Sequence, residues 1–285
     1  MANAADLKVA ENLVVLGIGS PGSGKSTALA SFSTPEEPGY MFDIDHRIRG
    51  ILGSRSFLGD DCIKSLDYDQ YDAKDGFKEI EKQFMELSVK YDKRELKYKN
   101  LFIESVGSLS RMFIIDCQRL KGFGPGKDLS ALKPEQRKGA RIIGNIAMAG
   151  PDEYRYGSDA FHSLFYNYFN YFTKCNVFLS GWTTDKWGFQ KDGDGNELPY
   201  ADKIVVGSQL LATNKIASEL PGYFDEIWEF KKEETGQASR PLRYTVTFRS
   251  AIAKTAIAQL PSGPVDITGK NFKKVFTELV AKGAK

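Results

Sequence analysis

Cysteine and histidine are both scarce in this sequence of 285 residues. Its three cysteines, Cys62, Cys117 and Cys175, are far apart and form no Cys-x-x-Cys pair, and His46 and His162 are the only histidines. A structural zinc site needs four such ligands at short spacings, so this composition argues against one. We expect the cysteines to be free, buried thiols, as is usual in a reducing compartment.

Net charge and long apolar runs are lacking too. The formal net charge is only +2, so any surface for nucleic acid has to come from local clustering of basic residues. No apolar run approaches the roughly 20 residues that span a bilayer, and no basic segment with an apolar core marks the N-terminus. We therefore expect a cytoplasmic protein with no membrane partner. The 41% of apolar and 27% of charged residues suit a globular protein with a proper core.

Short apolar runs alternate with segments of helical periodicity over most of the chain. The run from Leu13 to Ile18 is unbroken and ends at a glycine, which is typical of a buried parallel strand. Apolar residues at three- and four-residue spacing predict helices. The pattern predicts strands at 13–18, 39–45, 100–105, 175–180, 223–230 and 242–249, and helices at 25–33, 74–95, 106–119, 157–173 and 270–282.

This order of elements favours an α/β fold. Early strands alternate with helices and later strands follow one another, which predicts a mainly parallel central sheet flanked by helices and a β-rich C-terminal part. We expect a single domain over residues 1–285, with its core at about 12–256. Residues 120–155 are rich in glycine, proline and basic side chains and predict a mobile basic insertion. Residues 257–285 are expected to be a C-terminal extension with a helix.

The most specific motif directly follows the first apolar run. It fits G-x-x-x-x-G-K-[ST] and comprises Gly19, Ser20, Pro21, Gly22, Ser23, Gly24, Lys25 and Ser26, followed by Thr27. Small residues let successive backbone N–H groups surround phosphate oxygens, and the next helix presents its positive end to the same anion. Lys25 is expected to reach the β- and γ-phosphates, and the Ser26 hydroxyl to ligate magnesium. The sequence therefore predicts a phosphate-binding loop for ATP and Mg²⁺.

Acidic residues end two further predicted strands. A phosphate loop needs one carboxylate to hold magnesium and another to orient the attacking water, both at carboxyl ends of nearby strands. Glu104, after the apolar residues 101–103, is the candidate for magnesium. Asp45 is the candidate for orienting water, with Asp43 as the fallback. The alternative for each is an ordinary surface acid.

Three segments, in the same order, resemble motifs of the RecA superfamily. Besides the phosphate loop, residues 42–46 resemble the RecA segment in which the residue before His is the catalytic glutamate, and residues 100–109 resemble its magnesium-carboxylate strand. Over about 12–256 the chain resembles, more closely than RecA itself, compact phage-encoded ATPases with a RecA/RadA core that act in single-strand annealing and recombination. Those proteins carry Tyr-Gly before a helix, here at 156–157, and Leu-Pro-x-x-Phe-Asp near a late strand, here at 220–225.

The resemblance implies a RecA-like P-loop ATPase domain that assembles into a ring or filament. A cation from the neighbouring subunit would complete the catalytic site, and Lys254 is the matching residue, with Arg249 second. Glu104 stands where RecA has Asp, and Asp45 stands where it has Glu, which moves each carboxylate by one methylene. The polar sensor expected after the fourth strand is not obvious, and Thr183 is the candidate.

Two basic segments are candidates for contacts with single-stranded DNA. Basic charge interleaved with aromatic residues suits that ligand, and the two segments occupy the topological places of the DNA loops in RecA-like proteins. The candidates are Lys121, Phe123, Lys127, Lys133, Arg137, Lys138 and Arg141 in the first segment, and Lys186 and Trp187 in the second. A solvated charged loop and a plain β-hairpin with cross-strand aromatic packing are the alternatives.

Three functions remain open at this level. The first is an ATPase for recombination or single-strand annealing, with single-stranded DNA and other copies of the chain as partners and a single-strand-binding protein as a further candidate partner. The second is a small-molecule phosphotransferase of the nucleotide-kinase kind, although no short Arg-rich lid is evident. The third is a non-catalytic ATP-dependent switch or accessory protein, which the departures at Glu104 and Asp45 permit.

Overall fold

The computed structural model describes residues 12–125, 127–133, 135, 141–143, 146–189, 203–210, 214–239 and 241–283. The strands of its main sheet are β1 (Val14–Gly19), β2 (Gly39–Asp43), β3 (Leu66–Gln70), β4 (Asn100–Glu104), β7 (Asn176–Phe189), β8 (Lys203–Leu210), β9 (Glu226–Glu234), β10 (Leu242–Thr247) and β11 (Val265–Asp266). They are ordered β11-β10-β9-β1-β7-β4-β2-β3, with β8 paired to β7. Neighbouring strands from β9 to β3 are parallel, whereas β8, β10 and β11 pair antiparallel.

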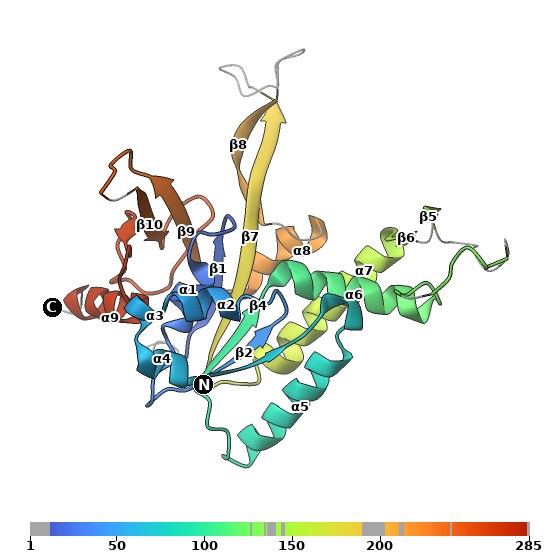
Figure 1. Cartoon of the computed structure of the whole chain (residues 1–285), viewed down its shortest axis with the longest axis horizontal. Helices are drawn as coiled ribbons and strands as arrows, with labels where there is room; N and C mark the ends of the chain where they lie inside the picture. Colours follow the sequence, from blue (N-terminus) through green and yellow to red (C-terminus); the bar gives the residue numbers. More distant parts are fainter. Residues whose placement is uncertain are drawn as a thin grey trace, which may run out of the picture.

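Helices flank this sheet on both sides (Figure 1). They are α1 (Lys25–Ala30), α2 (Ile48–Gly53), α3 (Arg55–Leu58), α4 (Asp60–Lys64), α5 (Lys78–Asp92), α6 (Val106–Leu120), α7 (Pro151–Leu164), α8 (Asn214–Glu219) and α9 (Phe272–Gly283), with short 3₁₀ or π turns at η2 (Ala73–Asp75), η4 (Phe165–Phe169) and η5 (Leu220–Tyr223). The α/β class and the mostly parallel central sheet are thus as the sequence predicts. In the described part of the chain, no helix has the length and apolar character needed to cross a membrane.

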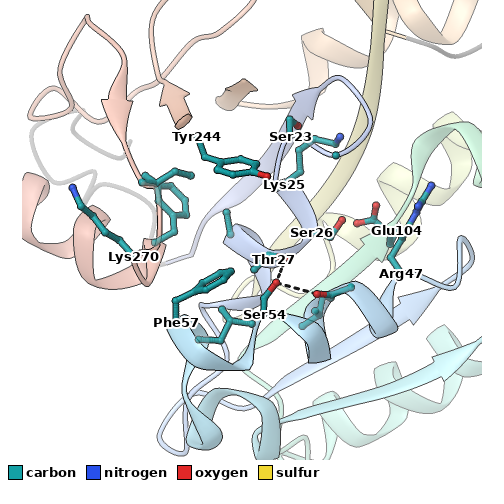
Figure 2. Close-up of a pocket in the computed structure, with 18 of the residues that line it drawn as sticks. Ser23, Lys25, Ser26, Thr27, Arg47, Ser54, Phe57, Glu104, Tyr244 and Lys270 are labelled. Carbon is teal, nitrogen blue, oxygen red and sulfur yellow. Dashed lines mark hydrogen bonds between the residues drawn. The ribbon is translucent and has the colours of Figure 1, made fainter. Parts of the chain in front are cut away.

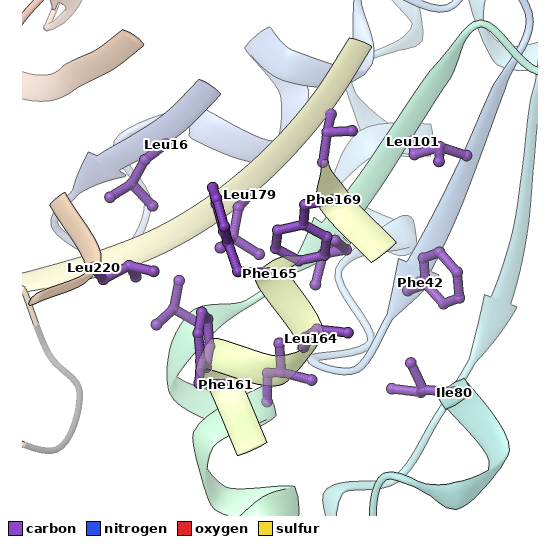
Figure 3. Close-up of a cluster of buried hydrophobic side chains, with 14 of the residues drawn as sticks. Leu16, Phe42, Ile80, Leu101, Phe161, Leu164, Phe165, Phe169, Leu179 and Leu220 are labelled. Carbon is purple, nitrogen blue, oxygen red and sulfur yellow. The ribbon is translucent and has the colours of Figure 1, made fainter. Parts of the chain in front are cut away.

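Both faces of the central strands are buried. Along β1, Leu16 packs into the cluster beneath α5, α6 and α7, while its neighbour Val15 packs into a second cluster on the other face. The same alternation occurs in β4, where Leu101 belongs to the first cluster and Phe102 to the second. Figure 3 shows the first cluster, in which aromatic side chains of α7 and η4 meet the sheet. Two-sided burial explains why these strands are unbroken apolar runs in the sequence.

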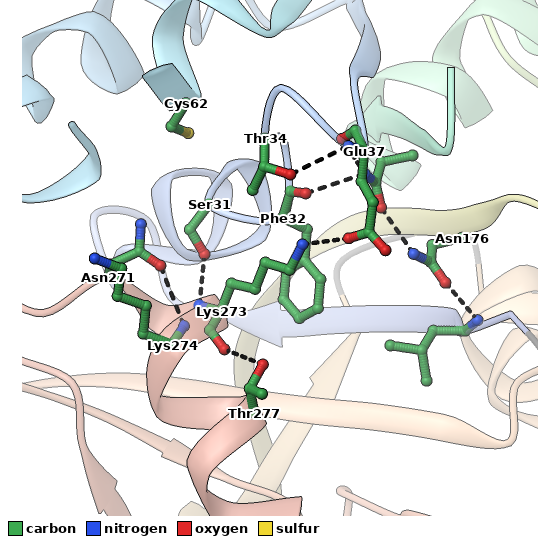
Figure 4. Close-up of polar contacts among 12 residues, drawn as sticks. Ser31, Phe32, Thr34, Glu37, Cys62, Asn176, Asn271, Lys273, Lys274 and Thr277 are labelled. Carbon is green, nitrogen blue, oxygen red and sulfur yellow. Dashed lines mark hydrogen bonds and ion pairs between the residues drawn. The ribbon is translucent and has the colours of Figure 1, made fainter. Parts of the chain in front are cut away.

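The C-terminal helix belongs to the second cluster. Phe272 and Phe276 of α9 pack there, 1% and 8% exposed. Polar contacts fix the helix against α1 and its flanking loop (Figure 4): the Lys273 amide donates to Ser31 Oγ at 2.9 Å, and the Lys273 ammonium forms an ion pair with Glu37. The segment expected as a C-terminal extension therefore contributes to the core.

Residues 46–70 form elements that the sequence pattern does not predict. Three short helices, α2, α3 and α4, connect β2 to the edge strand β3. None exceeds six residues, which is too short for a 3.6-residue apolar period to be recognised. The strand β3 is buried only at its first residue, Leu66, so it lacks the apolar run of the central strands.

The basic insertion expected at 120–155 contains ordered elements in its described part. The strands β5 (Arg141–Ile143) and β6 (Ile146–Met148) form an antiparallel pair. Helix α7 begins at Pro151, earlier than the sequence pattern indicates, because Glu153 accepts a 2.8 Å hydrogen bond from the Gly150 amide and closes the first turn.

Replacing Phe276 with Ala tests the contribution of α9 to the core. Removing this largely buried ring should lower the free energy of unfolding by about 3 kcal/mol, through lost burial and the cavity left behind. Urea denaturation measures the change. Glu278→Ala, at an exposed position of the same helix, should change stability by less than about 0.5 kcal/mol. Equal effects of the two substitutions would contradict the packing of α9.

Candidate functional site

The phosphate-loop motif connects β1 to α1. Gly19 ends β1 with a φ of 155°, and a Cβ at this position would lie 2.2 Å from the Phe230 carbonyl oxygen, so only glycine fits. Gly24 has a φ of 83° and caps the N-terminus of α1. The loop therefore turns sharply between a buried strand and a helix start, which is the context that the motif requires.

Lys25 opens α1 and is 4% exposed. Its ammonium donates hydrogen bonds to the carbonyl oxygens of Gly19 and Ser20, at 3.0 and 3.1 Å. Burial lowers the pKa of Lys25 to about 8, although the negative charge of Glu104 opposes this shift. A cation in a poorly solvated loop interacts strongly with any anion that enters.

Glu104 ends β4 and is 3% exposed. Burial raises the pKa of this carboxyl to about 7, against the lowering effects of the Ser180 and Ser26 hydroxyls and of Lys25. Figure 2 shows the carboxylate facing the Ser26 side chain. Among the described residues, no cation forms an ion pair with Glu104. A hydroxyl and an unpaired carboxylate are hard oxygen donors, so these residues fit a magnesium ion.

Asp45 lies beside this pair, just beyond the end of β2. One carboxylate oxygen accepts a 2.8 Å hydrogen bond from the Ser105 hydroxyl, and the other accepts one from Ser108. Its backbone amide contacts the Glu104 carbonyl oxygen at 3.3 Å. The side chain is half-buried and its position is fixed by two hydroxyls from the start of α6.

Asp43, the fallback candidate, has a different position. It is completely buried, and its carboxylate accepts hydrogen bonds from the backbone amides of Arg47 and Ile48, at 2.6 and 3.1 Å, and from the Gln70 side chain at 3.3 Å. These bonds satisfy amides at the start of α2. Asp43 therefore supports the turn that follows β2, and Asp45 is the acid whose charge acts on the Glu104 carboxyl.

A cavity of about 410 Å³ runs past the phosphate loop, with Glu104 toward one end and the Tyr244 ring, which lies against Gly24 of the loop, toward the other (Figure 2). Lys25, Ser26 and Glu104 line one end of it, where Arg47 and Trp182 also lie. The other end is lined by residues that the sequence patterns do not single out, namely Ser54, Phe57, Tyr244, Ile267, Gly269 and Lys270. Figure 2 shows the Tyr244 and Phe57 rings on either side of this end. Two flat rings and an aliphatic wall suit the faces of a planar ring system such as a nucleobase.

Other predicted site residues lie elsewhere. Thr183 and Lys254 line a separate cavity of about 860 Å³ between β7, α8 and the segment after β10. Lys254 pairs through its backbone with Ile227. Arg249, the second candidate for a cation that acts on a neighbouring subunit, donates hydrogen bonds to the carbonyl oxygens of Leu260, Ile257 and Ala258. Within one chain the structure brings neither cation to the phosphate loop.

The first basic segment is only partly available to a ligand. The Lys121 ammonium contacts Asp152 at 3.1 Å and Glu153 at 2.9 Å, so its charge is neutralised. Phe123 is 8% exposed and does not present a ring face to solvent. Lys127 and Lys133 are exposed.

The remaining DNA candidates are described only in part. Arg137 and Lys138 lie outside the described residues. Arg141 belongs to β5, and Lys186 and Trp187 belong to β7, but their side chains are outside the description.

The chain matches no family model and no curated protein. The phosphate loop and Glu104 could be found from motifs, whereas Arg47, Trp182, Phe57 and Tyr244 belong to none of the motifs. Aromatic character is the one signal that could have indicated Trp182, Phe57 and Tyr244, and it gives no sign of Arg47.

The Glu104→Gln substitution tests the burial of the site in the absence of ligand. The folded chain binds the Glu104 proton more tightly than the unfolded chain, since the pKa rises from 4.5 to about 7. The contribution of this group to stability is therefore lost as pH rises from 4.5 through 7. At pH 8 we expect Glu104→Gln to raise the free energy of unfolding by about 2 kcal/mol, and near pH 4.5 this gain should vanish.

Urea denaturation at the two pH values measures the effect. Glu36→Gln removes an exposed carboxylate and serves as the control, with no pH-dependent gain expected. A gain of equal size at both pH values would show that the burial of a charge is not its cause.

Proposed function

We propose that this chain binds ATP with magnesium and hydrolyses it. The observation that carries the proposal is that Lys25, the Ser26 hydroxyl and the buried Glu104 carboxylate line one cavity at the carboxyl ends of parallel strands. Phosphoryl transfer needs positioning and charge stabilisation more than covalent chemistry, and these residue types supply both. The ring-lined end of the cavity supports a nucleoside triphosphate over inorganic polyphosphate.

Each residue has a distinct part in the proposed reaction. The amides of the loop and the Lys25 ammonium bind the β- and γ-phosphates and stabilise charge on the transferred group. Ser26 and Glu104 hold magnesium, which neutralises phosphate charge when bound. The Asp45 carboxylate, held by Ser105 and Ser108, orients the attacking water and accepts its proton.

The proposed biological role is recombination or annealing of single-stranded DNA by a RecA-like oligomer in the cytoplasm. This rests on the resemblance of the three motifs and on one structural observation. Strand β7 runs from Ser180, beside Glu104, through Trp182 in the cavity to Lys186 and Trp187, between which its pairing with β8 shifts register. There it forms an antiparallel hairpin with β8 that projects from the body of the molecule (Figure 1). A hairpin that is continuous with the nucleotide site is suited to coupling ATP binding and hydrolysis to contacts with single-stranded DNA.

The decisive experiment measures ATP hydrolysis with and without single-stranded DNA. We expect turnover that DNA increases several-fold, and a loss of about 100-fold or more in kcat/KM in Lys25→Ala, which removes a phosphate-binding cation. Lys99→Ala, at an exposed lysine outside the cavity, is the matched control.

Two results would replace this proposal with the alternatives. Turnover that depends on a nucleoside or nucleotide acceptor would indicate a small-molecule phosphotransferase. Tight ATP binding without turnover, with or without DNA, would indicate a switch or accessory protein.

The basic insertion provides a test of DNA binding. The test variant replaces Lys127, Lys133, Arg137 and Lys138 with Gln, and the control variant replaces the exposed lysines Lys78, Lys82, Lys90 and Lys93 of α5 and its C-cap. Removing phosphate contacts should weaken binding and flatten the plot of log K against log salt by up to about 3 units of slope. Fluorescence anisotropy of a labelled oligonucleotide measures both effects. Equal behaviour of the two variants would exclude the insertion as the DNA surface.

A further inference from the structure

Arg47 has a fixed backbone at the edge of the nucleotide site. It follows His46, which adopts a left-handed conformation with a φ of 54°, and it caps the N-terminus of α2. Its amide donates a 2.6 Å hydrogen bond to the buried Asp43 carboxylate. The same carboxylate accepts the next amide, that of Ile48, at 3.1 Å. The turn after β2 therefore determines where the Arg47 side chain begins.

The side chain of Arg47 lies over an aromatic ring that belongs to the site. Its Cζ atom is 5.2 Å from the centroid of the Trp182 ring. Trp182 is the register partner of Gly19, the first residue of the phosphate loop, in the β1–β7 pair. In Figure 2 the Arg47 side chain lies on the same side of the cavity as Glu104. A cation–π contact holds a guanidinium over a ring and leaves its N–H groups available for other partners.

The Arg47 charge is uncompensated within the described part of the chain. No described carboxylate lies within ion-pair distance of its guanidinium. Its charge nevertheless acts on the site, because it contributes, after burial, to the lowered pKa of Lys25. Two cations that repel each other across a cavity are a suitable arrangement for a polyanion.

The two ends of the cavity indicate which part of a nucleotide Arg47 meets. Tyr244 and Phe57 line the ring-lined end, whereas Arg47 lies with Glu104 at the opposite end. A nucleotide whose base lies between the rings extends its phosphates across the loop toward Glu104. The group that reaches Arg47 is then the one most distant from the base.

We propose that Arg47, held on Trp182, binds the terminal phosphate of the nucleoside triphosphate from within the same chain. The inference rests on the proposed function and assigns a residue that distinguishes ATP from ADP at that site. An arginine is always charged, and its planar fork matches phosphate oxygens, so it stabilises charge that develops during transfer. The role requires no residue of a neighbouring subunit.

Binding of two ligands by the Arg47→Ala variant tests the inference. Isothermal titration with a non-hydrolysable ATP analogue and with ADP, both with Mg²⁺, gives the two values of Kd. We expect the analogue to bind about tenfold or more weakly, since a charge-assisted hydrogen bond is lost, while ADP changes by less than twofold. Arg49→Ala, at an exposed arginine of α2 outside the cavity, should leave both values unchanged.

A second readout follows the contact between Arg47 and Trp182. The indole fluorescence of the wild-type chain should change with the analogue and not with ADP, and both Trp182→Phe and Arg47→Ala should abolish that change. Arg47→Lys keeps the charge but not the planar fork and should recover only part of the affinity for the analogue.

The outcomes separate this inference from the proposed function. If the wild-type chain binds the analogue and Arg47→Ala binds it equally well, or loses analogue and ADP to the same extent, the role of Arg47 is wrong and the ATP site stands. If the wild-type chain binds neither ligand, the proposed function fails and this inference fails with it. Because the bond from the Arg47 amide to Asp43 does not involve the side chain, the alanine variant should fold normally.

Discussion

Burial of opposite charges at one edge of the parallel sheet is the constraint on which the site depends. Lys25 and Glu104 are almost completely removed from water, and for each the loss of hydration is the largest influence on its pKa. Such groups are unfavourable unless the fold holds them close to compensating partners. The strand order supplies that closeness, because β7 alone lies between β1 and β4 and their carboxyl ends share one edge. The same cost would be offset by the phosphate and the magnesium ion of the proposed function, which would compensate both charges.

The sequence alone predicted the elements that consist of an unbroken apolar run or carry a specific motif. Unbroken apolar runs predicted β1 and β4 because both faces of these strands are covered, and the phosphate loop followed from glycines that only its geometry requires. Short helices between β2 and β3 and the early start of α7 were missed, because they depend on caps such as Asp43 and Glu153. The exposure of Phe123 was also misjudged, since a glycine-rich neighbourhood gives no sign that the ring packs inward.

The cavity could be predicted only in part from the sequence, because it is assembled from segments that are far apart in the chain. Its phosphate end comes from residues 21–28, 47, 104 and 182, whereas its ring-lined end combines Phe57 with Tyr244 and with residues that lead into α9. No local pattern relates Arg47 to Trp182, or Phe57 to Tyr244, because each pair meets only through the order of strands. The C-terminal region, which had been expected to be an extension, thus both fills the core and closes one wall of the site.

Strand β7 continues well beyond its pairing with β1, and this length has a mechanical consequence. Trp182 stands near its middle, and the strand continues to Phe189 as one arm of a hairpin. An extended strand rises about 3.3 Å per residue, so these seven steps form a lever roughly 23 Å long. A rotation of about 5° at its base would move the tip by about 2 Å, on the order of half the spacing between strands. Small rearrangements near Trp182 would therefore be amplified with distance, and along the described strand the displacement would be greatest at Phe189.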